Sequence, residues 1–600
     1  MKNKFTVLLF CVISLNNISI ASSEKPQTIM SFVVSMEQPN THYFHVIFRC
    51  EGLKGESEDF KMPAWTPGYY KIMDFARNVL NFRAEDGDGK ALAWEKTAKN
   101  IWRVQSNKAN TIVVSYDVYA FRQSVADSYL DDSQAYIAPT GIFMNIEGEI
   151  KHSVTVTIKP HKNFSKISTG LDAVKDKPNT FVAPDFDVLY DCPILVGNQE
   201  ILSFEVQGIP HSAAILEPGN FDHEKFVSTL TKMIESATAV VGEIPYRHYT
   251  FIMMGEGQGG LEHQNSMAVF SKVPNFDDER DYKRWLSFIT HEYFHLYNVK
   301  AIRPAALGPF DYDKENYTNM LWFSEGGTVY YEYLILNRAG LMSRSEVLEH
   351  LKDSMAKYEN IPGRLFQSAA ESSFDIWLNF LNWGGNANNT TISYYDKGFA
   401  IAMLLDLKIR YETKNKKSLD DVMRILYQKY YKEKNRGFTD KEFREVCENV
   451  AGGPLNELFD EYISTVKEVD YRKYLGYAGL NIDTEPNEIT GAHLGATGDD
   501  ESGKLIIQQV ELNSPAQQFG LSIQDEIIAI DGKRANLRSL NETLKSKKGG
   551  EKIQVLISRR NKISEVEVTL GKKTERSFNI KPVENPSLLQ SEILNNWLKE

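Results

Sequence analysis

The chain has 600 residues, of which 42 % are hydrophobic and 25 % charged, and its 68 Lys and Arg stand against 80 Asp and Glu for a formal charge of −12. This composition excludes a disordered chain and a collagen-like fibre, the acidic balance disfavours a nucleic-acid binder, and four cysteines are too few for a disulfide scaffold. At roughly 150 residues per domain, the length predicts about four domains.

Residues 1–21 are predicted to be a secretory signal peptide. Two lysines precede an apolar run over residues 5–15, and a small-residue cleavage site follows at Ala21. This run is too short to cross a bilayer and no later run reaches about 18 apolar residues, so we expect no stable membrane span. Cys11 would permit a lipoprotein, but the bulky Phe10 before it disfavours lipidation. We therefore expect an exported protein, periplasmic or secreted, whose remaining cysteines are buried and reduced.

Four successive patterns follow the signal peptide and predict a multidomain α+β protein. Residues 25–206 show short strand-like runs separated by turns, which predicts an N-terminal β-sandwich. Helical periodicity dominates residues 207–474. Strands and glycine turns return over residues 484–571, and residues 572–600 read as a polar, mostly irregular tail.

A glycine-rich segment over residues 255–266 precedes the strongest motif. Its glycines, which include Gly259 and Gly260, would let an extended peptide pair with the backbone. The carboxylate of Glu262 beside them could hold a free α-ammonium group. Glycine-rich loops are common without any ligand, so this segment alone is weak evidence.

The strongest motif is His291-Glu292-x-x-His295. Residues four apart lie on one face of a helix, so both histidines can reach one ion. Glu292 lies beside that face, where it can act as a general base toward water. Apolar residues at helical spacing, with Pro304 beyond the end, support a helix here. A helix with two packed histidines and no metal is the alternative.

A catalytic zinc needs a third protein ligand and an open position, and Glu325 is the candidate ligand. It stands in Trp322-Phe-Ser-Glu-Gly on a predicted helix that runs to about Gly340, with its side chain on the apolar face. A buried carboxylate needs a partner, which a zinc ion would supply. A salt-bridged core glutamate is the alternative, and Glu332 is the next candidate ligand.

Together these motifs resemble the gluzincin metallopeptidases, and the segment from Glu292 to Pro304 resembles the glycyl aminopeptidase family. The segment Pro63-Ala-Trp-Thr-Pro-Gly-Tyr-Tyr70 is similar to the N-terminal sandwich of that family. The resemblance implies a β-sandwich, a thermolysin-like zinc peptidase domain and a C-terminal PDZ domain. It also implies removal of small N-terminal residues, glycine or alanine, from peptides.

The glycine-rich segment takes a role from the same resemblance. Gly259-Gly260-Leu-Glu262-His263 resembles the Gly-Ala-Met-Glu-Asn segment that anchors the substrate amine in related aminopeptidases. Glu262 stands at the position of the glutamate that binds the amine, and His263 stands in place of the asparagine. The resemblance therefore implies that these four residues contact the substrate.

A second segment resembles the part of related enzymes that stabilises the oxyanion. Tyr395-Asp-Lys-Gly is similar to their Tyr-Glu-Lys-Gly segment. A phenol does this by donating a hydrogen bond to the developing charge, worth about 3 kcal/mol. Tyr395 is therefore the predicted oxyanion donor, with Tyr394 as the competing choice and a packed aromatic at a helix start as the alternative.

Residues 506–532 are PDZ-like, with a Gly-Leu turn and an Ile-x-x-Ile-Asp-Gly hairpin. A PDZ groove accepts a peptide as an added strand and binds its C-terminal carboxylate with backbone amides. The predicted carboxylate loop is His493-Leu494-Gly495-Ala496. A structural cap without a ligand is the alternative.

We therefore predict a zinc-dependent aminopeptidase with one Zn²⁺ per chain, acting on peptides with a free N-terminus, whose PDZ domain takes a C-terminal peptide ligand. A zinc endopeptidase and a non-catalytic peptide-binding protein acting through its PDZ domain are the alternatives. The intact Glu292 argues against the second, because binding needs no general base. Since every predicted catalytic residue lies between Glu262 and Tyr395, a chain ending near Asp483 is expected to hydrolyse short substrates.

Overall fold

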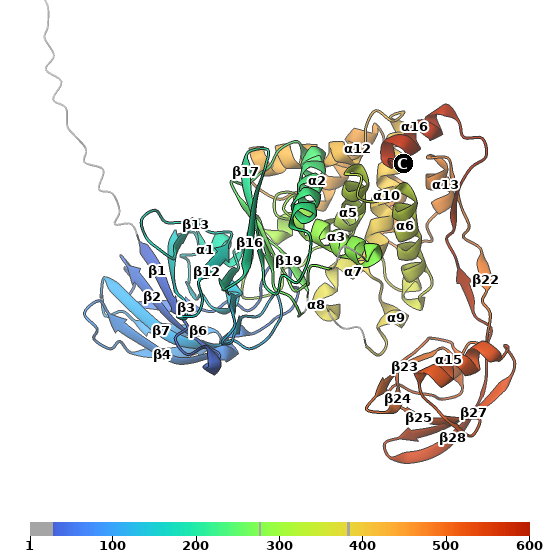
Figure 1. Ribbon diagram of the computed structural model, residues 1–600, viewed down its shortest axis with the longest axis horizontal. Helices are drawn as coiled ribbons and strands as arrows, with labels where there is room; N and C mark the ends of the chain where they lie inside the picture. The colour runs from blue at the N-terminus through green and yellow to red at the C-terminus, as the bar shows by residue number, and fades with distance from the viewer. Residues whose placement is uncertain (1–27, 258, 275–277, 381–383) are drawn as a thin grey trace, which may run out of the picture.

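The structure is a computed structural model that describes residues 28–257, 259–274, 278–380 and 384–600. The predicted signal peptide, residues 1–21, lies outside these residues. A β-rich domain, a mainly helical domain and a smaller β-domain follow one another along the chain (Figure 1). The predicted multidomain α+β class is confirmed.

The N-terminal domain is a β-sandwich, as the short strands predicted. A seven-stranded sheet of order β13-β14-β11-β1-β2-β7-β4 faces a four-stranded sheet of order β10-β3-β6-β5. Phe48 of the first sheet packs edge-on against Phe60 of the second, with ring centroids 5.8 Å apart. Residues along these strands alternate between buried and exposed, because successive side chains point to opposite faces of a sheet. The elements of this domain are β1 (Ile29–Ser35), β2 (Tyr43–Glu51), β3 (Ser57–Lys61), β4 (Val79–Asp86), β5 (Trp94–Ala98), β6 (Ile101–Gln105), β7 (Thr111–Tyr119), β8 (Tyr129–Leu130), β9 (Ala135–Ile137), β10 (Asn145–Ile146), β11 (Val154–Lys159), β12 (Lys166–Thr169), β13 (Asp172–Ala173), β14 (Thr180–Ala183), α1 (Phe186–Tyr190) and β15 (Ile194–Gly197).

A five-stranded sheet opens the helical domain, in the order β16-β17-β18-β20-β19. Its strands are β16 (Glu200–Val206), β17 (Ile209–Ile215), β18 (Tyr249–Met253), β19 (Gly260–Glu262) and β20 (Ser266–Val269). The predicted domain boundary at residue 206 therefore falls inside a hairpin, since β16 pairs with β17 throughout its length. One face of this sheet packs against helices, and the other packs against β9 and β15 of the N-terminal domain. This contact fixes the N-terminal domain beside the edge strand β19.

The helices surround a long central helix, α10, which is buried along most of its length. Tertiary packing of this kind supplies most of the stability of protein helices. The helical elements are α2 (His223–Val241), α3 (Glu279–Phe294), α4 (Leu321–Ser324), α5 (Gly326–Arg338), α6 (Arg344–Glu359), α7 (Ala369–Phe374), α8 (Ile376–Asn379), α9 (Ala387–Thr390), α10 (Tyr394–Glu412), α11 (Leu419–Leu426), η6 (Tyr427–Glu433), α12 (Asp440–Ala451), η7 (Glu457–Ile463) and α13 (Tyr471–Gly476).

In chain order, the smaller β-domain lies between strands β22 and β29, which pair with each other. Its sheet has the order β23-β24-β25-β27-β28, with β26 paired to β25. Strand β21 pairs with β30, and β22 pairs with β29, so the chain leaves and returns along one two-stranded connection (Figure 1). The elements are β21 (Leu480–Ile482), β22 (Pro486–Glu488), β23 (Ala496–Glu501), β24 (Lys504–Val510), α14 (Pro515–Gln518), β25 (Glu526–Ile530), β26 (Lys533–Arg534), α15 (Leu537–Ser546), β27 (Lys552–Arg559), β28 (Lys562–Thr569), β29 (Thr574–Arg576) and β30 (Ile580–Pro582).

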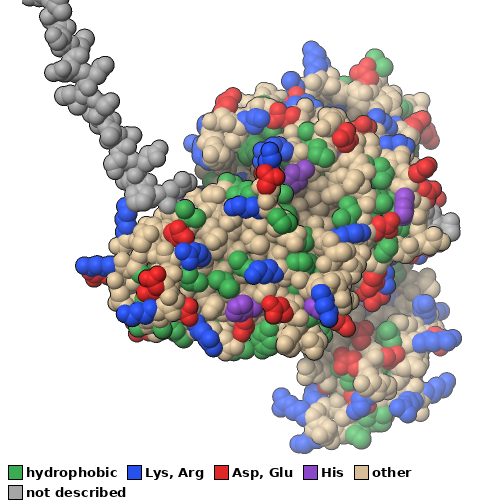
Figure 2. All heavy atoms as spheres, turned by 60° about the vertical axis from the view of Figure 1, so that its left-hand side comes forward, with side chains coloured by type: hydrophobic (Ala, Val, Ile, Leu, Met, Phe, Trp, Pro, Cys, Tyr) green, Lys and Arg blue, Asp and Glu red, His purple; other side chains and the backbone are tan. Residues whose placement is uncertain are grey.

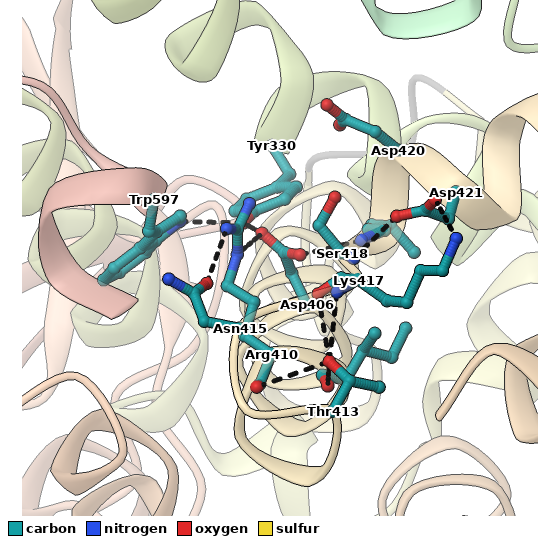
Figure 3. A network of polar contacts seen from close by, with 12 residues as sticks. Tyr330, Asp406, Arg410, Thr413, Asn415, Lys417, Ser418, Asp420, Asp421 and Trp597 are labelled. Carbon is teal, nitrogen blue, oxygen red and sulfur yellow. Dashed lines mark hydrogen bonds and ion pairs between the residues drawn. The ribbon is translucent and has the colours of Figure 1, made fainter. Parts of the chain in front are cut away.

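The last thirty residues are not the irregular tail that their polarity predicted. After β30 the chain forms α16 (Leu588–Trp597), which Ser587 begins with a reciprocal capping box, and the helix returns to the helical domain. Trp597 is buried there, and its indole N–H donates to the hydroxyl of Tyr330 over 2.8 Å. That hydroxyl donates to Asp406, which also accepts from Arg410 (Figure 3). Residues 587–598 are therefore part of the helical domain, joined to it across the inserted β-domain.

No helix in the described residues is both long and apolar enough to cross a membrane. Cys50, Cys192 and Cys447 are free and buried, as expected. On the face drawn in Figure 2, acidic and basic side chains lie mixed over the surface.

Candidate metal centre

Helix α3 carries both histidines of the H-E-x-x-H motif. Asp278 caps its N-terminus by accepting from the amide of Asp281, and apolar residues on the inner face pack into the core. His291 lies in the last turn and His295 directly follows it, one turn further on. Their Nε2 atoms lie 3.0 Å apart, so both rings point at one position.

Each histidine is held by its other ring nitrogen. Nδ1 of His291 contacts the carboxylate of Glu332 on α5 at 2.8 Å, and Nδ1 of His295 contacts the carbonyl oxygen of Asn298 at 2.8 Å. Carboxylate and carbonyl oxygens only accept, so each Nδ1 carries the proton and each Nε2 presents a lone pair. Glu332, the reserve candidate for the third ligand, therefore orients His291.

Glu325 lies at a break between two helices rather than inside one continuous helix. Helix α4 ends at Ser324 and α5 begins at Gly326. The side-chain amide of Asn298 donates to the carbonyl oxygen of Phe323 over 2.9 Å, which ties the end of α4 to the segment after α3. The break turns the buried carboxylate of Glu325 toward the two imidazoles, and its Oε2 lies 3.5 Å from Nε2 of His291 and 3.2 Å from Nε2 of His295.

These three side chains fit a zinc ion. A tetrahedral site with ligands at about 2.1 Å separates its donor atoms by roughly 3.4 Å, close to the spacings above. The donor set of two imidazoles and one carboxylate is that of catalytic zinc sites that keep an open position. Burial alone would raise the pKa of Glu325, but the neighbouring imidazoles His295 and His291 outweigh burial and lower it, so the carboxylate is ionised and ready to bind a cation.

Glu292 is buried beside the metal position and is covered by a glycine. Burial raises the pKa of its carboxyl group to about 7. A Cβ on Gly260 would lie 2.2 Å from Oε1 of Glu292, so only glycine allows strand β19 to pass this close to the carboxylate. The edge strand β19, which has no strand partner on its outer side among the described residues, thus runs directly over the predicted general base.

Glu262 ends strand β19 and faces a turn from the N-terminal domain. A Cβ on Gly68, which has a φ of +84°, would lie 2.9 Å from Oε1 of Glu262. The ammonium group of Lys300 lies 3.9 Å from the same oxygen. Burial lowers the pKa of Lys300, but the carboxylates of Asp191 and Glu262 outweigh burial and raise it. Lys300 therefore stays positively charged beside Glu262. The carboxylate of Glu262 is thus buried at the end of edge strand β19, beside a positive charge.

Asp191 of the N-terminal domain holds the segment that carries Glu262. Its carboxylate accepts from Lys300 over 2.8 Å and from the amide of Gln264 over 2.8 Å, and it contacts Nδ1 of His263 at 3.1 Å. Burial would raise its pKa, but Lys300 and His263 lower the pKa to about 2. His263 is buried and is held by this contact with Asp191, and its contact with a substrate stays a prediction. Nothing in the local sequence singles out Asp191, which sequence reasoning missed.

Tyr395 reaches the metal position because two helices approach closely at glycines. A Cβ on Gly326 would lie 2.5 Å from Cα of Gly398, so α5 and α10 touch there through their backbones. The ring of Tyr395 lies 6.1 Å from that of His291, and Tyr394 stacks on it at 4.7 Å. Burial, followed by the charge of Glu325, raises the pKa of Tyr395 well above its usual value, so its phenol remains a hydrogen-bond donor.

The predicted carboxylate loop of the smaller β-domain precedes its edge strand β23. The carbonyl oxygens of Leu494 and Gly495 accept from Ala516 and Glu511, whereas no acceptor among the described residues partners the amides of Leu494 and Gly495. His493 pairs with Gly571 through its backbone. Two adjacent free amides before an open strand edge are the arrangement that binds a peptide carboxylate.

Three family models match the chain. The Peptidase M61 N-terminal domain matches residues 31–198, the M61 glycyl aminopeptidase model matches residues 284–401, and a PDZ domain model matches residues 492–570. All four residues of the H-E-x-x-H and Glu325 set lie inside the second match.

Solved structures and curated proteins give further likenesses. An aminopeptidase N family protein from Idiomarina loihiensis aligns over 95 % of this chain and all of its own, with 28 % identity and a TM-score of 0.87. An M1 zinc metallopeptidase from Deinococcus radiodurans aligns over 74 % of this chain and 96 % of its own, with 11 % identity and a TM-score of 0.47. The serine protease Do-like HtrB of Bacillus subtilis is 29 % identical over 110 residues, 18 % of this chain. The chain spans about a quarter of the length of the curated relatives it matches.

Proposed function

The chain belongs to the M61 glycyl aminopeptidase family and is a metallopeptidase, and from this premise we propose that it is a zinc-dependent aminopeptidase that removes a small N-terminal residue, glycine or alanine, from peptides. One observation carries the proposal. The buried carboxylate of Glu262 ends the edge strand that passes over Glu292, so an anchor for a positive charge lies on the strand that covers the general base.

We assign the metal to His291, His295 and Glu325, with one Zn²⁺ per chain. A zinc ion held there supplies a Lewis acid that polarises the scissile carbonyl and lowers the pKa of water. The hydrogen bonds from Nδ1 of each histidine support this assignment, because zinc-binding histidines are almost always oriented by such a partner.

The residues of the chain divide the remaining work. Glu262 holds the α-ammonium group of the peptide, whose backbone pairs with β19. Glu292 takes a proton from the attacking water and returns it to the leaving amine, a role that suits a carboxyl group with a pKa near 7. Tyr395 donates a hydrogen bond to the carbonyl oxygen as negative charge develops there.

The test is the release of N-terminal glycine from a free peptide and from its N-acetylated form. Acetylation removes the charge that Glu262 binds, so we expect at least a 100-fold lower kcat/KM for the acetylated peptide, an estimate of about 3 kcal/mol for a buried charged hydrogen bond. Equal cleavage of both peptides would favour an endopeptidase. A zinc-loaded protein that cleaves neither would favour the peptide-binding alternative.

Two further assignments belong to this proposal. The PDZ domain takes the C-terminus of a peptide at the loop from His493 to Ala496, supported by the two free amides. Export to the periplasm or the medium rests on the charged and apolar start of the sequence. Peptide-array binding to the full chain tests the first, and mass spectrometry of the N-terminus after cell fractionation tests the second.

A further inference from the structure

A cavity of about 520 Å³ is lined by residues of both the β-sandwich and the helical domain. Its lining includes Lys151, Asp185 and Asp187 of the sandwich, and Arg303 and Asn435 of the helical domain. Neither the three metal ligands nor any other predicted catalytic residue is part of the lining. The volume is in the range of sites that hold a small molecule.

Arg303 is held in place without using the N–H groups of its side chain. A Cβ on Gly308 would lie 2.2 Å from Cζ of Arg303, so the guanidinium lies against the backbone of that glycine, and the ring of Phe310 lies 6.0 Å from it. The carbonyl oxygen of Arg303 accepts from the amide of Phe438 over 3.0 Å, which fixes its backbone. No oxygen atom of the described residues accepts a hydrogen bond from this guanidinium. A fixed arginine with free donors is suited to bind a carboxylate through two hydrogen bonds.

The sandwich side of the cavity carries one carboxylate more than its lysine can neutralise. The ammonium group of Lys151 contacts Asp187 closely and Asp185 at 3.4 Å. Asp187 also accepts from the hydroxyl of Tyr312 over 2.8 Å. Asp185 has only the longer contact with the lysine, and it caps α1 by accepting from the amide of Val188 over 2.9 Å. Its carboxylate can therefore take a further cation.

The other charged groups of the lining are paired. The ammonium group of Lys300 contacts Asp191 at 2.8 Å, and Arg436 forms two hydrogen bonds with a glutamate of α12. Two groups of opposite charge thus remain for a ligand, the guanidinium of Arg303 and the carboxylate of Asp185. A simple anion would satisfy the first and leave the second without a cation.

We propose that this cavity binds a zwitterion, a free amino acid or a short peptide, with its carboxylate on Arg303 and its ammonium group on Asp185. Such a ligand connects the β-sandwich to the helical domain and so stabilises the contact between them. Molecules of this class are the products of peptide hydrolysis, so the site fills as the reaction proceeds. The site itself does not depend on the proposed activity, because its residues take no part in the metal centre.

The experiment is calorimetry with glycylglycine on the full, zinc-loaded chain carrying Glu292→Gln, which prevents hydrolysis of the peptide. We expect glycylglycine to occupy two sites, this cavity and the catalytic centre. Adding Arg303→Gln should weaken binding to the cavity by about ten-fold or more, because charge-assisted hydrogen bonds are lost. Arg284→Gln is the matched control, since Arg284 is 79 % exposed on α3 and pairs with Asp281 at the surface.

Two analogues test whether both charges of the ligand are read. Glycylglycinamide lacks the carboxylate and N-acetylglycylglycine lacks the ammonium group, so each should bind the cavity more weakly than glycylglycine by about ten-fold or more. Asp185→Asn should weaken glycylglycine binding in the same way, and it keeps α1 because asparagine caps a helix as well as aspartate does. This variant also tests the site if Arg303→Gln does not fold.

Equal binding of N-acetylglycylglycine and glycylglycine at the cavity would overturn the zwitterion site, because a carboxylate alone would then suffice. Glycylglycine binding that neither Arg303→Gln nor Asp185→Asn changes would overturn the site altogether. If the proposed function is wrong, the catalytic centre does not bind the peptide, and the binding that depends on Arg303 is still measured. The two failures are therefore distinguishable.

Discussion

The two zinc-binding histidines differ in what holds them. His295 contacts a backbone carbonyl, which no substitution removes, whereas His291 contacts the carboxylate of Glu332 on another helix. We expect Glu332→Gln to weaken zinc binding about 10–100-fold, because the neutral amide holds the ring less firmly and makes it a poorer ligand. Competition with a chromophoric chelator measures the affinity. Glu349→Gln, on the exposed face of α6, is the control, and equal affinity in both variants would show that Glu332 plays no part.

A second substitution separates the metal from the proton transfer. Glu292→Gln should keep its zinc, because all three ligands remain. Its turnover should fall by about 10²–10⁴-fold, because the substitution removes the general base. Glu325→Ala should instead lose the metal. Metal analysis and glycyl anilide hydrolysis on both variants check the two roles. A Glu292→Gln protein without zinc, or with nearly wild-type turnover, would contradict the assignment.

The sequence predicts the metal ligands more completely than their surroundings. His291, His295 and Glu325 could be named because a helix places residues four apart on one face, and because a buried carboxylate needs a cation. Asp191 could not, since its partners lie in another domain and no spacing rule connects them. The resemblance placed His263 at the substrate, but it gave no sign of the contact that His263 makes with Asp191.

At the scale of elements, sequence periodicity predicts where the main helical region lies, but it does not predict where each helix ends. The continuous helix predicted through Glu325 breaks there, because Asn298 and the Gly326–Gly398 contact override local helix preference. Helix α16 was overlooked among polar residues, although Leu589, Ile593 and Trp597 recur four apart. Long helices with one apolar face are the elements that the sequence identifies most surely.

Helix α16 gives a prediction about stability. Trp597→Ala removes a buried ring and its hydrogen bond to Tyr330, so the free energy of unfolding of the helical domain should fall by about 3–5 kcal/mol. Leu588→Ala in the same helix is the control, since Leu588 is 77 % exposed, and should change the stability little. Urea denaturation followed by helical circular dichroism measures both. Equal stability of the two variants would mean that α16 adds nothing to the domain.

At the scale of the whole molecule, the catalytic centre is shared between domains. Gly68 and Asp191 come from the β-sandwich and meet strand β19 and Lys300 of the helical domain. The contact of the sandwich with the five-stranded sheet brings these residues to the site. Composition and periodicity separate the two domains along the sequence, but long-range packing of this kind leaves no local pattern by which it could be predicted.

The PDZ domain, by contrast, is an insertion that the rest of the chain encloses. A chain ending near Asp483 would lose β29, β30 and α16 together with the PDZ domain, so the truncation suggested by the sequence would also remove part of the core of the helical domain. The paired strands offer a cleaner excision. The amide of Ile489 donates to the carbonyl oxygen of Lys573, so residues 490–572 can be replaced by Asn-Gly, which closes such a pair as a two-residue hairpin.

We predict that this excised protein keeps the melting temperature of the helical domain and hydrolyses glycyl anilide at nearly the rate of the full chain. The reason is distance: no residue of the metal centre or of the Glu262 segment belongs to the removed part, and a dipeptide-sized substrate is too short to reach both sites at about 3.3 Å per residue. Long peptides should bind more weakly, because the second contact, with the PDZ domain, is lost.

The excision does remove the contacts of Asn388 and Asn389 with strand β24 and the residues after it, and Asn388 also lines the cavity beside Tyr394. The double substitution Asn388→Ala and Asn389→Ala in the full chain therefore serves as the control. A large fall in turnover that the excised protein and this double variant share would mean that the PDZ domain shapes the active site through α9.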